Sequence, residues 1–351
     1  MSSHASSELP VGMAGLRYGI SQVSLAVKDV DALVRAYHRA FGWAAWKVFD
    51  HVQPLHHGTE RFGQPSEFSM RGAEVQVGSL NFELLQPLSG VNLWQEHIDE
   101  HGEGIASIAT MFEEEDDSEA VKKAFKQEFG LDVILKGLIG PHIEYYYLDT
   151  RADFGCFIES GSGHALDFVE PTYEWPSKGA PLGPSPESGI MYPLTQVSLT
   201  VHDLGAKMRA YHRAFGWGPW RVYESSDRGV MHDCVSHGAK ADFRIRWAET
   251  MVGDMNFELV EPLGGSSPWQ DFHDRHGDGI SSVSVAMPDA ATAGRVRDQF
   301  AADGIGIAAS GRLGDDVDWF MLDTEVPFKC VIKSGTGHGF DSDAPYTTWE
   351  A

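Results

Sequence analysis

The chain has 351 residues, of which 42% are hydrophobic, and this length is typical of about two globular domains. It has 51 Asp and Glu against 27 Lys and Arg, and the formal net charge of -24 opposes binding to nucleic acid or to anionic membrane surfaces. Three cysteines form no disulfide framework, and neither a secretory signal nor a stretch of roughly 20 apolar residues is present. We therefore expect a cytoplasmic protein that acts on a small molecule, without nucleic-acid or membrane partners. Homo-oligomer formation stays open.

The sequence contains an internal repeat. The segment RAYHRAFGW occurs at 35–43 and again at 209–217, and NFELLQPL at 81–88 returns as NFELVEPL at 256–263. Self-similarity on this scale indicates two copies of one domain. The expected organisation is an N-terminal tail at 1–18, a first domain at 19–172, a linker rich in Pro, Gly and Ser at 173–191, a second domain at 192–341 and a C-terminal tail at 342–351.

The first unit of copy one begins with a strand. Residues 20–27, ISQVSLAV, alternate between apolar and small polar side chains. Apolar residues then recur at helical spacing over 30–41, with Asp29 placed to cap this helix and Gly42 placed to stop it. Strands are expected around Trp46, at 69–77 and at 81–86, so the unit reads βαβββ.

A second unit repeats this order. A short helix at 91–102 leads to a strand at 104–110, and an acidic run at 113–117 opens a longer helix, which suits the helix dipole. Strands are expected around Val133, at 143–148 and at 154–160. Copy two repeats both units from Leu194 to about Lys333. We therefore expect an α+β fold of two tandem domains, each of paired βαβββ units.

One charged residue is unusual for its place in a strand. In the segment 81–86, Phe82 and Leu84 point to one face, whereas Asn81, Glu83 and Leu85 point to the other. A carboxylate set among apolar neighbours needs a partner, a metal or water to offset its desolvation. Copy two repeats this setting at Glu258. The pattern indicates a functional cavity on this face.

These features together resemble the vicinal oxygen chelate superfamily, which includes glyoxalase I, methylmalonyl-CoA epimerase, extradiol dioxygenases and bleomycin-resistance proteins. The likeness rests on the paired βαβββ units, the FGW turn, the FELLQP strand and the HGEGI segment, and it covers about Ile20 to His338. It implies that each pair of units forms a cup-shaped mixed sheet with four inward positions for a divalent metal. We prefer cups made of units one with two and three with four, but pairing of one with four and two with three stays open.

The resemblance assigns metal positions residue by residue. In copy one they fall on Gln22, Glu83, Ser107 and Glu159, and in copy two on Gln196, Glu258, Ser282 and Lys333. Serine stands where the resembled enzymes place histidine, and its hydroxyl is a poorer ligand than imidazole. We therefore expect one divalent ion (Mg, Mn, Zn, Ni or Fe) on Gln22, Glu83 and Glu159, with a metal-free cup as the alternative. Lys333 would repel a cation, so we expect it to pair with Glu258.

The resemblance also limits the chemistry. Neither cup supplies the two histidines and one carboxylate that the ring-cleaving dioxygenases use, so ring cleavage is not expected. The preferred function is a lyase, epimerase or isomerase acting next to a carbonyl, with Glu83 and Glu159 as metal ligands or as acid and base. The expected substrate contacts are Asn81, Ser107, His142 and His164. The alternative is a metal-free protein that sequesters an apolar or aromatic compound.

Overall fold

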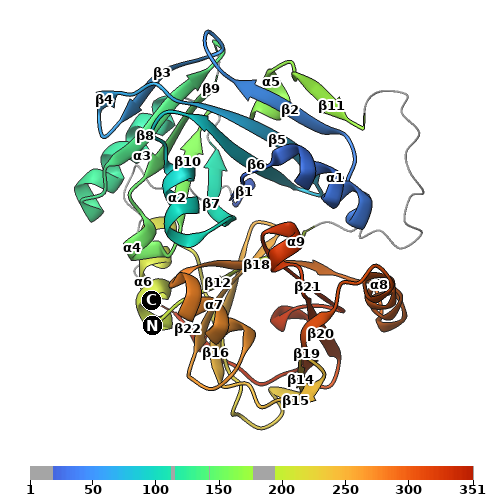
Figure 1. The fold of residues 1–351 in the computed structure, drawn as a ribbon. Helices are drawn as coiled ribbons and strands as arrows, with labels where there is room; N and C mark the ends of the chain where they lie inside the picture. The colour runs from blue at the N-terminus through green and yellow to red at the C-terminus, as the bar shows by residue number, and fades with distance from the viewer. Residues whose placement is uncertain (1–18, 112–114, 142, 177–193, 351) are drawn as a thin grey trace.

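The computed structural model describes residues 19–111, 115–141, 143–176 and 194–350. The described strands form two curled mixed sheets of 11 strands, one for each copy (Figure 1). The predicted α+β fold with two tandem cups is thereby confirmed. No helix within the described ranges is long and apolar enough to cross a membrane.

The elements of copy one alternate strands and helices in the order β1 (Gln22–Ala26), α1 (Val30–Phe41), β2 (Trp46–His51), β3 (His56–Arg61), β4 (Gln64–Pro65), β5 (Ser69–Val77), β6 (Leu80–Ser89), α2 (Leu93–His101), β7 (Gly104–Met111), α3 (Glu115–Phe129), β8 (Val133–Ile139), β9 (Ile143–Leu148), α4 (Arg151–Phe154), β10 (Phe157–Gly161), α5 (Ala165–Phe168) and β11 (Tyr173–Trp175). Copy two follows with β12 (Gln196–Thr200), α6 (Leu204–Phe215), β13 (Trp220–Glu224), β14 (Met231–Ser236), β15 (Ala239–Lys240), β16 (Ile245–Val252), β17 (Met255–Pro262), α7 (Pro268–His276), β18 (Gly279–Ala286), α8 (Ala290–Ala302), β19 (Ile307–Leu313), β20 (Val317–Leu322), α9 (Glu325–Phe328), β21 (Val331–Gly335) and β22 (Thr347–Trp349).

Each sheet is built around the first strand of its copy. β1 pairs in parallel with β6 of its own unit and antiparallel with β7 of the next unit, and β12 pairs in the same way with β17 and β18. The strand β1 therefore joins units one and two in one cup, and β12 joins units three and four in the other. In the sheets, the alternative pairing of units one with four and two with three does not occur.

Helix α1 begins and ends where the sequence predicts. The side chain of Asp29 accepts a hydrogen bond from the backbone N–H of Ala32 at 2.9 Å, and Gly42 adopts a left-handed φ of 69°. A carboxylate cap satisfies a backbone donor that has no partner within the helix, and glycine takes the left-handed conformation without steric penalty. The apolar stripe of the helix is buried against the outer face of the sheet.

Some segments differ from the sequence-based expectation. A strand was expected at 154–160, but Arg151–Phe154 form the helix α4 and the strand starts only at Phe157. The segment around His56, which lacks a clear pattern, forms β3 and pairs with β8 of the second unit. Residues 173–175 and 347–349, which we placed in the linker and the tail, form β11 and β22 and pair with β2 and β13. Short strands of mixed polarity carry little periodic signal, because distant partners determine them.

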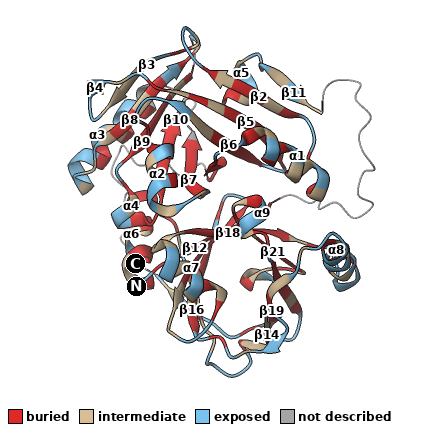
Figure 2. Cartoon of the chain, in the orientation of Figure 1, coloured by how far each residue is buried: buried red, intermediate tan, exposed pale blue. Residues whose placement is uncertain are grey.

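The helical layers of the two copies pack against each other. Buried residues follow the central strands of both sheets (Figure 2), and one buried apolar cluster contains residues of both copies. At its centre, the hydroxyl of Tyr37 on α1 donates to the carbonyl of Phe328 on α9 at 2.7 Å, and that of Tyr211 on α6 donates to the carbonyl of Phe154 on α4 at 2.9 Å. The sheets therefore join units within a copy, whereas the helices join one copy to the other.

Loss of one of these tyrosine hydroxyls should weaken the whole fold. We expect Tyr37→Phe to lower the free energy of unfolding by about 1–3 kcal/mol, because the buried carbonyl of Phe328 loses its donor. Tyr211→Phe should have a similar effect, and Tyr346→Phe, at a tyrosine that is 45% exposed, should have little. Urea unfolding of the three variants tests this, and equal stability of Tyr37→Phe and Tyr346→Phe would contradict it.

Candidate functional site

The first cup holds a pocket of about 370 Å³ on the inner face of its sheet. Gln22 from β1, Glu83 from β6, Glu159 from β10 and His164 at the start of α5 all line it. These side chains come from separate strands, and the pairing around β1 and β7 brings the strands together. Four of the predicted site residues therefore share one cavity.

Two other predicted residues do not line this pocket, and for a third the position is not described. The side chain of Asn81 points to the Glu74 carboxyl instead, donating from Nδ2 to Oε2 at 2.7 Å. Ser107 is fully buried on β7, where its Oγ has no hydrogen-bond partner. His142 lies outside the described residues. Asn81 therefore contacts the pocket lining through Glu74.

A third buried carboxyl group, Glu74 on β5, was missed by the sequence analysis. Glu74 is the cross-strand partner of Glu83 and is 1% exposed, and it also accepts a hydrogen bond from the backbone N–H of Leu166 at 3.0 Å. Copy two repeats the arrangement, because Asn256 donates to Glu249 at 2.7 Å as Asn81 does to Glu74. The recurrence of this Glu–Asn pair in both copies was the signal that could have revealed it.

Aromatic side chains complete the lining. His51 from β2 and both Tyr145 and Tyr147 from β9 face the same pocket, as does Trp94 from α2. The hydroxyl of Tyr145 lies 2.6 Å from Nε2 of the buried His56. Side chains alternate between the two faces of β9, so Tyr145 and Tyr147 both point into the cup.

Burial raises the pKa of all three carboxyl groups. The pKa of Glu83 is raised well above its ordinary range by burial and by the carboxylates of Glu159 and Glu74, although Ser24 Oγ donates to Glu83 at 2.6 Å and offsets part of this. Burial raises the pKa of Glu159 to about 8; the Tyr147 hydroxyl lowers it in part and Glu74 raises it further. The pKa of Glu74 is raised by burial to about 7. The three carboxyl groups therefore hold protons more tightly than an exposed carboxyl does, and the ionisation of one affects the pKa of the others.

The two histidines of the pocket stay neutral near pH 7. Burial lowers the pKa of His51 to about 3, and His56 lowers it further. Burial lowers the pKa of His164 to about 4, against an opposing effect of Asp167. A neutral imidazole can accept or donate one hydrogen bond at each nitrogen, and Nδ1 of His51 and of His164 has no partner. These atoms remain open to a bound molecule.

As arranged, these side chains do not form a metal site. Within the described ranges, no group of three or more His, Cys, Asp or Glu is placed to hold a metal ion. The third carboxyl group, Glu74, is already engaged by Asn81, and Glu83 accepts from Ser24. Two oxygen atoms that line the pocket or lie beside it, Gln22 Oε1 and Glu159 Oε2, have no hydrogen-bond partner. They are acceptors that suit donor groups of a substrate.

The second cup differs from the first at the position of Glu159. Here Lys333 donates from Nζ to both carboxyl oxygens of Glu258, at 3.0 and 2.9 Å, which confirms the predicted pair. Gln196 accepts from the hydroxyl of Ser284 at 2.9 Å within the same sheet. Ser282 lines a separate cavity beneath α7. Lys333 therefore places a positive charge where the resemblance expects a metal ligand.

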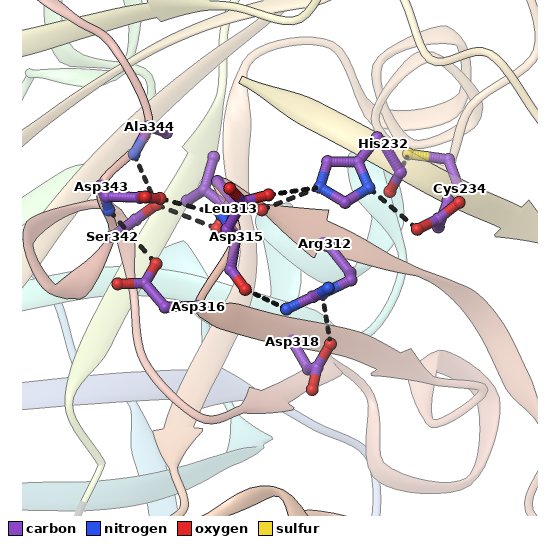
Figure 3. Close-up of polar contacts among 12 residues, drawn as sticks. His232, Cys234, Arg312, Leu313, Asp315, Asp316, Asp318, Ser342, Asp343 and Ala344 are labelled. Atoms are coloured by element: carbon purple, nitrogen blue, oxygen red, sulfur yellow. Dashed lines mark hydrogen bonds and ion pairs between the residues drawn. The ribbon is translucent and has the colours of Figure 1, made fainter. Parts of the chain in front are cut away.

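The rim of the second cup is fixed by contacts from the C-terminal segment. In Figure 3, the turn that connects β19 to β20 has His232 on one side and the segment of Ser342 and Asp343 on the other. His232 Nε2 lies 2.8 Å from the carbonyl of Gly314, Ser342 Oγ donates to the carbonyl of Leu313 at 2.9 Å, and Asp343 accepts from the backbone of Asp315 at 2.8 Å. The turn is thus held on two sides.

Comparison with known proteins agrees with this architecture. Residues 195–315 match the family model described as the Glyoxalase/Bleomycin resistance/Dioxygenase superfamily. The matched residues lie in the second copy, which is thus similar to this superfamily. Among curated protein sequences, none matches the chain.

Solved structures are similar to the chain over most of its length. A mutant of 4-hydroxymandelate synthase from Streptomyces coelicolor is 12% identical with a TM-score of 0.53, and the match covers 95% of this chain and 94% of that one. A Mn(II)-bound glyoxalase from Novosphingobium aromaticivorans is 12% identical with a TM-score of 0.46, over 94% and 83% of the two chains. At this identity the similarity concerns the fold, and the reaction follows from neither.

The raised pKa of Glu159 should make stability depend on pH. Its folded pKa of about 8 exceeds the ordinary value of 4.5, so this group stabilises the fold fully below about pH 4.5 and loses that contribution as pH rises through 8. We expect Glu159→Gln to gain stability relative to the wild type between pH 5 and pH 8, by at most about 1.4 kcal/mol per pH unit. Urea unfolding across this range measures the difference. Glu174→Gln, at an exposed carboxyl, should show the same pH dependence of unfolding free energy as the wild type. The same pH dependence in Glu159→Gln would contradict the expectation.

The ion pair in the second cup should be costly to break from one side. Lys333 and Glu258 are 9% and 5% exposed, so Lys333→Met leaves a buried carboxylate without its partner. We expect a loss of about 3–5 kcal/mol in the free energy of unfolding, most of it recovered in the double variant Lys333→Met, Glu258→Leu. A double-mutant cycle by denaturant unfolding tests this. Additive effects of the two substitutions would show that the pair is not coupled.

Proposed function

We propose that the first cup catalyses proton transfer at a carbon atom next to a carbonyl group, as a lyase, epimerase or isomerase. The observation that carries this proposal is one pocket lined by two carboxyl groups, both of whose pKa values are raised by burial. Burial and its neighbours raise the pKa of Glu83 well above its ordinary range, and that of Glu159 is about 8. Pairs of titratable groups whose pKa values are pushed apart are suited to acid and base roles.

The roles follow from these proton affinities. In its ionised form, Glu159 takes the proton from the substrate carbon, and the electrons move onto the carbonyl oxygen. The protonated Glu83 donates a hydrogen bond to that oxygen as negative charge develops there. Gln22 Oε1, which has no partner in the free protein, accepts a hydrogen bond from a donor on the substrate. Return of the proton to the carbon, or loss of a neighbouring leaving group, completes the reaction.

A second candidate function is binding of an aromatic compound without turnover. It is favoured by Trp94, Tyr145 and Tyr147, which line the same pocket as the carboxyl groups. Aromatic walls supply a large apolar contact area. A protein of this kind would still bind after Glu159→Gln, whereas an enzyme would stay folded and lose turnover.

Hydrogen–deuterium exchange at carbon separates the two functions. A panel of 2-hydroxy ketones, 2-substituted thioesters and 2-oxo acids is incubated with the protein in D₂O and followed by NMR. We expect exchange next to the carbonyl in at least one class, reduced about 10²–10⁴-fold in Glu159→Gln and in Glu83→Gln. The control Glu261→Gln, at a carboxyl that pairs with Arg246 in the second copy, should exchange like the wild type. Binding of panel members without any exchange would contradict catalysis and favour sequestration.

The same assay tests the metal-free roles of the two carboxyl groups. The exchange rate should rise with pH to about pH 8, as Glu159 ionises. It should also be unchanged after treatment with a chelator. About one equivalent of a divalent ion by elemental analysis, lost in Glu83→Gln and Glu159→Gln together with the exchange activity, would contradict these roles.

A further inference from the structure

The second cup has a pocket of its own, of about 440 Å³, with a different lining. Three tryptophans surround it: Trp247 from β16, Trp269 from α7 and Trp319 from β20. The rings of Trp269 and Trp319 lie 5.8 Å apart.

The first cup lacks this aromatic enclosure. Strand register places Gly72 where the second cup has Trp247, because Gly72 pairs with Leu85 as Trp247 pairs with Val260. Tyr145 stands where the second cup has Trp319. The two cups therefore present different walls and different charges, and a molecule that suits one does not suit the other.

Two of these tryptophans carry donors with no acceptor. Trp269 and Trp319 are 5% and 8% exposed, and the indole Nε1–H of each has no hydrogen-bond partner. The third, Trp247, donates to Glu249 Oε1 at 3.2 Å. A buried donor without an acceptor is destabilising, and a ligand that supplies an acceptor relieves this.

The charged groups of the pocket already have hydrogen-bond partners within the protein. Lys333 is bonded to both oxygens of Glu258, and Glu249 accepts from Asn256 Nδ2 at 2.7 Å and from the backbone of Gly339 at 3.2 Å. An added carboxylate would face the carboxyl groups of Glu258 and Glu249, and an added ammonium group would face Lys333. These opposing effects favour an uncharged ligand.

We propose that the second cup is a separate binding site for a neutral, planar aromatic compound that carries a carbonyl oxygen. The ring lies among Trp247, Trp269 and Trp319, and the carbonyl oxygen accepts from the free indole N–H groups. The rim in Figure 3 holds Leu313, which also lines the pocket, so the site is preformed. This site is independent of the proton transfer proposed for the first cup.

Calorimetric titration with four naphthalene compounds tests the proposal. The probe is 2-acetylnaphthalene, a neutral aromatic ketone, and the comparisons are naphthalene, 2-naphthoate and 2-naphthylmethylammonium. We expect the ketone to bind about five- to tenfold more tightly than naphthalene, as one neutral hydrogen bond allows, and more tightly than both charged analogues. Failure of the ketone to bind at about 1 mM, or tighter binding of either charged analogue, would overturn the proposal.

Variants locate the bound ketone. Trp269→Phe and Trp319→Phe keep an aromatic ring but remove the N–H, so each should reduce the advantage of the ketone over naphthalene. Trp175→Phe is the matched control, because the indole N–H of Trp175 also has no hydrogen-bond partner but Trp175 lines neither pocket. It should bind the ketone like the wild type. Loss of binding in Trp94→Phe alone would place the ketone in the first cup and overturn the assignment.

A measurement on the wild-type protein avoids dependence on the folding of the variants. The chain has ten tryptophans, and each indole N–H gives one signal in a ¹H–¹⁵N correlation spectrum. The ketone should shift the signals of Trp269 and Trp319 downfield, as expected for a new hydrogen bond, and naphthalene should not. Binding that leaves both indole signals in place would contradict the proposed contact.

Discussion

Desolvation of ionisable side chains on the inner face of a curled sheet is the constraint on which both cups depend. Strand alternation gives one face of β1, β6 and β10 to the helical layer, so the remaining side chains must point into the cup. In copy one these include Glu83 and Glu159, and Glu74 joins them from β5. Copy one tolerates three buried carboxyl groups because they hold protons near neutral pH, as their raised pKa values show. The proton that makes burial tolerable is also the proton that chemistry can use.

Copy two meets the same constraint with an internal counter-ion. Lys333 replaces the third acidic position and neutralises Glu258, so the cup needs no bound proton there. The Glu–Asn pair on the neighbouring strands is kept in both copies, at Glu74 with Asn81 and Glu249 with Asn256. The same fold therefore accommodates buried carboxyl groups in two ways, by raised pKa values in copy one and by an ion pair in copy two. The copies differ here in side chains of the inner face, whereas β1 pairs with β6 as β12 pairs with β17.

The fold could be predicted from the sequence because its signals are local. Alternation in the first strand, helical spacing after Asp29 and the internal repeat depend only on neighbouring residues. Three of the four metal positions expected from the resemblance, Gln22, Glu83 and Glu159, share a pocket, whereas Ser107 does not line it. Glu74 was missed because its role depends on its partner across the sheet. The strand β3 was missed for the same reason, since it pairs with a strand of the other unit.

The exchange of tyrosine hydrogen bonds between the copies bears on how such a chain evolves. Tyr37 bonds the backbone of copy two, and Tyr211 bonds that of copy one, at equivalent points. After the duplication that produced the two halves, each half came to complete the interior of the other, so neither can be lost without exposing the shared apolar layer. Selection on that layer keeps the halves alike on the outside of the sheets. The inner faces belong to separate apolar clusters, and there copy one has Gly72 and Glu159 where copy two has Trp247 and Lys333.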